Sequence, residues 1–452
     1  MATLLPTNKP FTGSPLKLSA PLGAAMAFLG MEGCQPLLHG SQGCTAFALV
    51  MLVRHFREAI PLQTTAMNEV STILGGMDNV EQALLNIAKR VKPRLIGLIS
   101  TALTETRGED MAGELKIILA RRPELAESKV VLVSAPDYEG SLETGYGKAV
   151  TALLDGLLPA DGPAFKDARR VNILPGAHLT PGDIEHLREI VEAFGLSAVV
   201  VPDLSGSLDG HVPDHYIATT LGGASLEDVA GMGAARLTIA VGAHMRAAAE
   251  LAQTRTGVPS LVFDRLTGLE ECDRLMSTLS KLSGRPVPER LRRARSQLED
   301  AMLDGHFYFG GARFAVAGEA DFVWAVGGLV TAMGGALVAA VSAEARPHLA
   351  GLPCAQVLVG DYQDLEDAAQ AAGGVDLVIG GTNARMSCER LGAGHVHAGF
   401  PVYDRLGGAH RVSIGYRGTR DLIFLIANRM IERSGHGHGA AEQDHAAAVA
   451  AG

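Results

Sequence analysis

Short apolar runs along the chain alternate with longer segments in which apolar residues recur every three or four positions. A short apolar run is typical of a strand buried on both faces, whereas the longer periodic segments are typical of helices that bury one face. The predicted strands span residues 95–99, 130–133, 171–174, 198–201, 237–241, 261–263, 314–316, 336–341, 356–359 and 377–379. Strands that alternate with helices in this way predict parallel sheets joined by right-handed crossovers.

Several predicted helices carry start and stop signals. Thr180 is a candidate N-cap, with Pro181 at the first helical position and Asp183 at the third, and Gly195 follows the last apolar residue of that helix face. Asp78 can cap another helix in the same way. The predicted helices span residues 44–56, 78–91, 111–119, 181–194, 289–303, 322–333 and 421–431.

Two polar stretches that contain proline and glycine divide this pattern. They lie at residues 161–167 and 284–288, and a chain of 452 residues is too long for one hydrophobic core. We therefore expect three α/β/α, Rossmann-like domains with mainly parallel sheets. The first spans residues 1–165, the second 166–285, and the third 286–452, which ends in a helix and a mobile tail.

One segment, residues 322–343, carries no charge and is long enough to cross a membrane. Gly334 and Gly335 interrupt it, however, so that a helix over residues 322–333 and a strand over residues 336–341 account for the same residues. Central helices and strands of an α/β domain are apolar on both sides. We therefore predict buried elements of a globular domain and no membrane helix.

The charge and cysteine content exclude several classes of protein. The formal net charge is −10, and no basic run stands out except at residues 290–295. This charge balance argues against binding to nucleic acid or to an anionic membrane surface. Residues 1–15 lack the charged and apolar regions of an export signal. Five scattered cysteines, an odd number, indicate a reducing compartment, so we expect a cytoplasmic protein.

The most informative cysteine is Cys44, at the end of the stretch His39-Gly40-Ser41-Gln42-Gly43-Cys44. It lies at or just before a predicted helix N-terminus, where backbone N–H groups and the helix dipole favour a thiolate. A thiolate on a glycine-rich turn is a suitable iron or zinc ligand. A lone cysteine can equally be a small buried apolar residue, and none of the other four cysteines has metal-ligand spacing to Cys44.

A series of short motifs extends along most of the chain. They lie at residues 29–33, 39–44, 54–56, 67–69, 74–76, 92–93, 100–101, 140–145, 222–223, 290–306, 313–315, 399–405 and 415–416. In this order they resemble the β-chain of the nitrogenase molybdenum–iron protein and its relatives in the nitrogenase component 1 family. The resemblance implies three α/β domains and a pairing with an α-like homologue.

The departures from the family pattern concern the cysteines that help to hold the eight-iron P-cluster in the catalytic β-chain. Cys44 matches one of the three, whereas Ser19 and Ala102 occupy the positions of the other two. Serine is a poor iron ligand and alanine is none, so the resemblance does not imply a P-cluster of the usual kind. The pattern is similar to the β-like subunit of the scaffold on which the iron–molybdenum cofactor is matured. In that branch a single cysteine completes a four-iron, four-sulfur cluster, and the resemblance assigns this role to Cys44.

The resemblance also implies partners. The first is an α-like scaffold subunit, which holds most of the cofactor precursor and forms an α2β2 heterotetramer with this chain. The others are a protein that donates this precursor and the nitrogenase Fe protein. The surface near Gly75 and Gly76 is the expected docking site for the Fe protein. The alternative is a β-like electron-relay subunit of a nitrogenase-type reductase, acting on dinitrogen or on a tetrapyrrole. A metal-free partner in which Cys44 is only a core residue is a further alternative.

Other candidate residues have simpler interpretations. His395 and His397 alternate along an extended segment as a metal pair would, but packing in the third domain accounts for them. His436, His438 and His445 lie in the expected tail, where adventitious metal binding is the simplest function.

The remaining motifs give no self-contained active site. Glu69 and Asp110 are isolated carboxylates, and neither a nucleophile elbow nor a metalloprotease motif occurs. The glycines after the predicted strands, Gly318 and Gly380-Gly381, form neither a dinucleotide nor a phosphate-loop motif, so we predict tight turns and no nucleotide site. The arginines at 292, 293 and 295 form a solvated, salt-bridged helix face or contact a partner subunit. We expect no catalytic residue on this chain.

Overall fold

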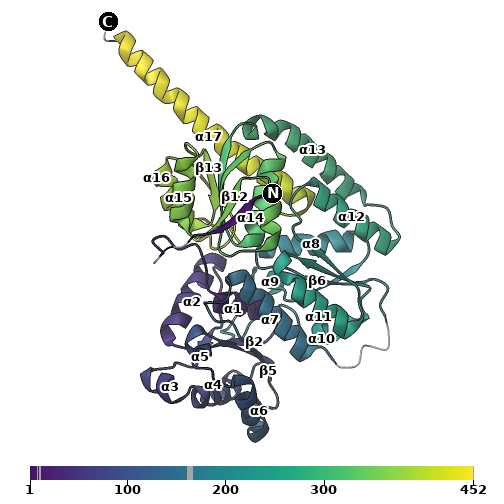
Figure 1. Ribbon diagram of the computed structural model, residues 1–452. Coiled ribbons are helices and arrows are strands. Elements are labelled where there is room, and N and C mark those ends of the chain that lie inside the picture. Colours follow the sequence, from purple (N-terminus) through teal and green to yellow (C-terminus); the bar gives the residue numbers. More distant parts are fainter. Residues whose placement is uncertain (8, 10–11, 160–165, 451–452) are drawn as a thin grey trace.

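Three parallel β-sheets with helices on their faces make up the molecule (Figure 1). The computed structural model describes residues 1–452 except 8, 10–11, 160–165 and 451–452, with side chains up to residue 434. Every pair of neighbouring strands among the described residues is parallel, which confirms the predicted fold class. The expected boundary at residues 161–167 falls largely outside the described residues.

The first sheet has the strand order β3-β2-β4-β5. Its strands are β2 (Cys34–His39), β3 (Gln63–Thr64), β4 (Leu95–Ser100) and β5 (Lys129–Val133). The helices around it are α1 (Ala20–Leu29), α2 (Gln42–Phe56), α3 (Glu69–Leu74), α4 (Met77–Arg90), α5 (Ala102–Glu105), α6 (Met111–Arg121) and α7 (Leu142–Leu157).

The second sheet has the strand order β7-β6-β8-β9. Its strands are β6 (Arg170–Leu174), β7 (Ser197–Val200), β8 (Leu237–Val241) and β9 (Ser260–Phe263). Its helices are α8 (Pro181–Ala193), α9 (Leu204–Ser207), α10 (Leu226–Ala230), α11 (Arg246–Thr256) and α12 (Leu269–Ser283). The predicted start of α8 is confirmed, because Thr180 and Asp183 form a reciprocal capping box before Pro181.

The third sheet has six strands in the order β1-β12-β11-β10-β13-β14. The strands are β1 (Thr3–Pro6), β10 (Arg313–Gly318), β11 (Ala336–Ser342), β12 (Gln356–Val359), β13 (Leu377–Gly380) and β14 (Gly394–His397). The helices are α13 (Glu289–Phe309), α14 (Ala320–Ala332), α15 (Tyr362–Ala371), α16 (Arg385–Leu391) and α17 (Gly415–Ala450).

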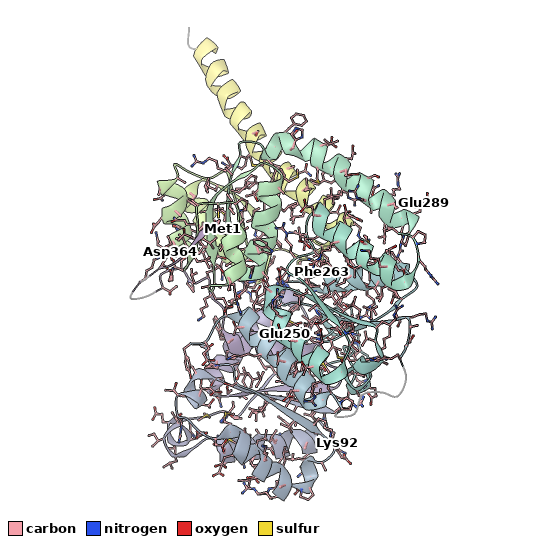
Figure 2. The ribbon with its side chains drawn as sticks, turned by 45° about the vertical axis from the view of Figure 1, so that its right-hand side comes forward. Met1, Lys92, Glu250, Phe263, Glu289 and Asp364 are labelled. Atoms are coloured by element: carbon pink, nitrogen blue, oxygen red, sulfur yellow. The ribbon has the colours of Figure 1, made fainter. Side chains whose placement is uncertain are left out.

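The first strand of the chain lies far from the residues that follow it in sequence. β1 pairs with β12, so residues 3–6 extend the third sheet, which the expected division at residue 165 does not foresee. Met1 and Asp364 accordingly both lie in the third-sheet unit, whereas Lys92 lies in the first-sheet unit at the opposite end (Figure 2). Burial within β1 is slight, and no apolar pattern marks it in the sequence.

The uncharged segment 322–343 forms α14 and β11, joined through Gly334 and Gly335, as predicted. No helix among the described residues is both long and apolar enough to span a bilayer. The last helix, by contrast, was predicted to end at residue 431 and to be followed by a mobile tail, and α17 instead continues to Ala450. No proline between residues 432 and 450 ends it.

Helices α1 and α7 cross at very short range in the core. A Cβ atom added to Gly145 would lie 1.8 Å from the carbonyl oxygen of Ala20, and one added to Gly23 would lie 1.9 Å from that of Leu142. Only glycine allows the two backbones to approach this closely. This crossing fixes the start of α7, and therefore Glu143, relative to the first sheet.

Candidate functional site

Cys44 is an exposed, free thiol near the N-terminus of α2. Ser41 is the N-cap of this helix, and its hydroxyl does not cap the backbone but donates to the Cys44 Sγ at 3.4 Å. The predicted position at a helix start is confirmed, and the exposure excludes a place for this thiol in the core of the free chain. Cys34, by contrast, is fully buried, and burial raises the pKa of its thiol.

The turn that carries Cys44 follows the carboxyl end of β2, and Ala102 follows the carboxyl end of the neighbouring strand β4. Thr101 joins the two turns, because its hydroxyl donates to the carbonyl of His39 at 2.9 Å. A Cβ atom on Gly40 would lie 2.7 Å from the Thr101 hydroxyl oxygen, so glycine is required for this approach. The turns of Cys44 and Ala102 therefore share one edge of the first sheet.

Ser19 has a structural task in the described chain. It is the N-cap of α1, and its hydroxyl accepts a hydrogen bond from the backbone N–H of Leu22 at 3.3 Å. This capping bond satisfies one of the free N–H groups at the start of a fully buried helix.

The outer face of α2 beside Cys44 is apolar and exposed. Phe47, Val50 and Val53 follow at helical spacing, with 65%, 51% and 38% of their side chains exposed. We call these three residues the α2 face. On the opposite side of the same helix Leu52 and Phe56 are buried, so only part of the apolar pattern along this helix faces the core. Apolar faces of this kind mark interaction sites.

The other sequence candidates have structural partners. His395 hydrogen-bonds the carbonyl of Gly380, and His397 lies 3.2 Å from Asp404. Asp110 caps α6 by accepting from the N–H of Gly113. Arg295 pairs with acidic side chains on its own helix and on α12, as a salt-bridged face requires. The side chains of His436, His438 and His445 lie outside the described residues.

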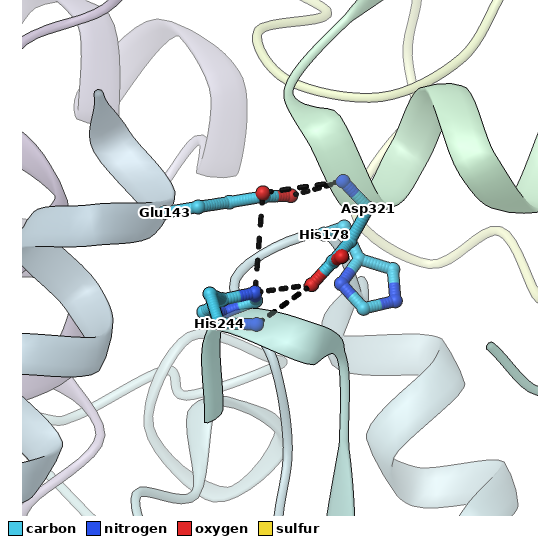
Figure 3. A group of neighbouring side chains, drawn as sticks. All are labelled: Glu143, His178, His244 and Asp321. Atoms are coloured by element: carbon cyan, nitrogen blue, oxygen red, sulfur yellow. Dashed lines mark hydrogen bonds and ion pairs between the residues drawn. The ribbon is translucent and has the colours of Figure 1, made fainter. Parts of the chain in front are cut away.

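A group of side chains that the sequence analysis did not identify lies where elements from the three sheet units meet (Figure 3). Glu143 comes from α7, His178 from the loop after β6, His244 from the turn after β8, and Asp321 from the first turn of α14. One ligand atom from each lies within 4.8 Å of all the others. His244 Nδ1 donates to Asp321 Oδ2, and Nδ1 also lies 3.9 Å from a Glu143 oxygen.

Helices α7 and α14 cap each other at this junction. Both carboxylate oxygens of Glu143 accept from the backbone N–H of Asp321 at 3.2 Å. In return Glu319 accepts from the Ser141 hydroxyl and from the N–H of Glu143. Each helix start is thus closed by a carboxylate from the other, in accord with the positive end of each dipole.

Burial controls the protonation of these groups. It raises the pKa of Glu143 well above its usual range, and the charges of Asp321 and Glu319 raise it further. Burial alone would also raise the pKa of Asp321, but the hydrogen bond from His244 and the imidazole of His348 close to the carboxylate hold this pKa well below its ordinary value. Burial lowers the pKa of His178 to about 4, which keeps that ring neutral.

A signal for this group does exist in the sequence. The triplet Gly-Ala-His follows two strands, as residues 176–178 after β6 and 242–244 after β8. These strands are parallel neighbours, so their carboxyl ends meet. The two carboxylates carry no such signal, because they approach the histidines only through the packing of α7 and α14.

Comparisons with known proteins agree with this architecture. A family model described as "Nitrogenase component 1 type Oxidoreductase" matches residues 19–431. The chain belongs to the nitrogenase component 1 family. It is also similar to "Nitrogenase Cp1 at pH 6.5", a solved structure with 28% sequence identity, a TM-score of 0.88, and coverage of 94% of this chain and 95% of that chain.

Within this family, several curated relatives are named "Nitrogenase iron-molybdenum cofactor biosynthesis protein NifN". The relative from Mesorhizobium japonicum is 50% identical over 430 residues, which cover 95% of this chain and 93% of the relative. The one from Bradyrhizobium diazoefficiens is 48% identical over 434 residues, with coverage of 95% and 92%. The one from Klebsiella pneumoniae is 38% identical over 438 residues, with coverage of 96% and 95%.

Proposed function

We propose that this chain is the β-like subunit of a scaffold on which the nitrogenase iron–molybdenum cofactor is matured. The observation that carries the proposal is the similarity to NifN proteins along nearly the whole chain, at 38–50% identity, together with one exposed cysteine at Cys44. The relatives are named for cofactor biosynthesis. The chain itself is a structural and electron-carrying part of the complex and has no catalytic residue of its own.

Cys44 supplies one thiolate to a four-iron, four-sulfur cluster that the chain shares with its partner. One thiolate cannot hold such a cluster, so the other ligands belong to the partner. The residues here fit a shared site: the thiol is exposed at a helix N-terminus, and the apolar α2 face adjoins it. When bound, the cluster supplies one-electron transfer, and the role of this chain is to hold it at the interface.

The partners follow from the same proposal. A NifE-type, α-like subunit covers the α2 face in an α2β2 heterotetramer and holds most of the cofactor precursor, which a NifB-type protein delivers in the cytoplasm. The Fe protein docks near Gly75 and Gly76. The neighbouring helix α3 supports this site, because its residues Val70, Ile73 and Leu74 are exposed apolar side chains.

The main alternative is an electron-relay subunit of a nitrogenase-type reductase. The identity of 28% to the nitrogenase structure is well below the 38–50% identity to NifN proteins. Ser19 caps a helix and Ala102 begins α5, so neither position offers the thiolate that a P-cluster requires. Both observations favour the scaffold.

The substitution Cys44→Ala tests the proposal. We expect the anaerobically purified complex with its α-like partner to assemble but to lose the reduced-state electron paramagnetic resonance signal of a four-iron cluster, and with it about four iron atoms per αβ pair. The measurements are iron content, the resonance spectrum, and gel filtration to establish assembly.

Cys354→Ala is the matched control, because Cys354 is a free, partly exposed thiol on the third-sheet unit. It should leave the iron content and the spectrum unchanged. An intact four-iron signal in the assembled Cys44→Ala complex would refute the role of Cys44. Reduction of dinitrogen or of a porphyrin-type substrate by the purified wild-type complex would instead favour the electron-relay alternative.

A further inference from the structure

We propose that Glu143, His178 and Asp321 bind a divalent transition-metal ion at the junction of the three sheets, with His244 as the residue that positions Asp321. The site is separate from Cys44 and does not depend on the proposed function. Its ligand set is one imidazole nitrogen and two carboxylates, which suits Zn²⁺.

The first argument is convergence of suitable ligand atoms. The four side chains come from α7, the β6–α8 loop, the β8–α11 turn and α14, yet their ligand atoms lie within 4.8 Å of one another. Atoms bound to one zinc ion at 2.0–2.2 Å can be no more than about 4 Å apart. Closing the group on an ion therefore requires side-chain shifts of less than about one ångström.

The second argument is that buried lone pairs in this group lack partners. Asp321 is fully buried, and its Oδ1 makes no hydrogen bond among the described residues. Nε2 of His348 lies 2.9 Å from that oxygen without the alignment of a hydrogen bond. Nδ1 of His178 is likewise buried without a partner in the described chain. Buried polar atoms are nearly always paired, so unpaired lone pairs that face one region indicate a missing ligand.

His244 has a different role, which its hydrogen bonds define. Its Nε2 accepts from the backbone N–H of Ala177 at 3.0 Å, so in the neutral ring the proton is on Nδ1. Nδ1 donates this proton to Asp321 Oδ2 and has no free lone pair for a metal. A carboxylate held in this way by a histidine is a typical outer-shell arrangement around a bound ion.

The charges at the junction also favour a cation. The buried carboxyl groups are those of Glu143, Asp321, Glu319 and Glu344, and the guanidinium of Arg346 pairs with Glu344. The two helix N-termini add about half a positive charge each. These positive partners are outnumbered by the four carboxyl groups, and buried charges of this kind are paired or coordinate metals.

Glycine provides the space beside the group. A Cβ atom on Gly242 would lie 2.7 Å from Asp321 Oδ2 and 3.0 Å from the His178 ring. A Cβ atom on Gly176 would lie 2.8 Å from the His244 ring and 3.0 Å from the His178 ring. Any larger residue at either position would push the two histidines away from Asp321.

Zinc retention tests the site directly. The protein is the full chain co-purified with its partner, with the three tail histidines replaced by glutamine so that the tail cannot bind zinc. It is incubated with ZnCl₂ and desalted, and the zinc content per chain is measured. We expect the His178→Gln variant to retain one zinc ion per chain fewer than the chain with His178. Any zinc on Cys44 cancels in this comparison, since both proteins contain it.

His395→Gln is the matched control, because Nδ1 of His395 is also buried and without a partner among the described residues but lies outside the junction. It should retain as much zinc as the unsubstituted chain. Equal zinc in the His178→Gln variant would overturn the proposal. If that variant does not fold, the zinc-edge anomalous map of crystals of the loaded complex decides: a peak between Asp321 and His178 supports the site, and a map without one refutes it.

Discussion

His55 lies on α2 but completes its hydrogen bonding in the third-sheet unit. Its Nδ1 accepts from the backbone N–H of Val402 at 2.9 Å, and burial lowers the pKa of the ring to about 4. The same Nδ1 lies 3.2 Å from the Val402 carbonyl oxygen, to which a protonated ring could donate, but burial outweighs this contact and favours the neutral ring.

This arrangement predicts a loss of stability in mild acid. Below pH 6.5 the unfolded chain binds a proton at residue 55 that the folded chain excludes until the pH approaches about 4. Lowering the pH from 7.5 to 5 should therefore cost about 2 kcal/mol of unfolding free energy through His55. The variant His55→Gln should lack this part of the pH dependence in urea titrations at the two values.

His306→Gln is the control for this measurement, because His306 is exposed on α13. It should preserve the pH dependence of the unsubstituted chain. An identical pH dependence in the His55→Gln variant would mean that His55 is not held neutral in the folded chain.

At the scale of single residues, the sequence predicted the position of Cys44 at a helix start but not the group of side chains around Asp321. Cys44 was identifiable because its turn and helix are contiguous in sequence. Glu143 and Asp321 were not, because 178 positions separate them and only the packing of α7 against α14 brings them together. Local patterns carry no information about such a contact.

At the scale of elements, the crossing of α1 and α7 has the least tolerance for change. Gly145→Ala would place a methyl group 1.8 Å from the backbone oxygen of Ala20, where no side chain can move aside. We expect a loss of about 3 kcal/mol in unfolding free energy, the upper part of the usual range for overpacking. Thermal unfolding or soluble yield of the complex measures it.

Gly156→Ala provides the comparison within the same helix. Gly156 is exposed, and its added Cβ would lie 3.3 Å from a single side-chain methyl of Val131. Because alanine is a better helix former than glycine, this variant should be neutral or slightly stabilised. Equal losses in the two variants would show that the close crossing of α1 and α7 is not the cause of the loss at Gly145.

Two of the elements that the sequence analysis missed, α1 and β2, lack the local pattern that would identify them. Helix α1 is buried all round, so it has no apolar stripe of helical period to reveal it. Strand β2 contains Pro36, which argues against a central strand, but its partner β3 pairs only with Leu37 and Leu38, so Pro36 has a neighbouring strand on one side only. The predicted helices and strands with clear periodicity were confirmed.

At the scale of the whole molecule, residues distant in sequence build each unit. The third sheet takes its edge strand β1 from the start of the chain, and His55 of α2 contacts the loop after β14. The sequence predicted the class of fold because each βα unit carries a local pattern. It could not predict these exchanges, because they depend on contacts between segments several hundred residues apart.

The α2 face gives the last prediction, on the assembly of the complex. Phe47 is 65% exposed beside Cys44, and a large aromatic side chain at the centre of an interface commonly contributes most to binding. Phe47→Asp should weaken the association with the α-like partner at least tenfold, since truncation of such a residue costs about 2 kcal/mol or more. Co-purification and analytical ultracentrifugation measure the association.

Ile117→Asp on α6, with a similar exposure of 59%, is the control and should leave the complex intact. A Phe47→Asp chain that still co-purifies in full with its partner would place the interface elsewhere and would separate Cys44 from it.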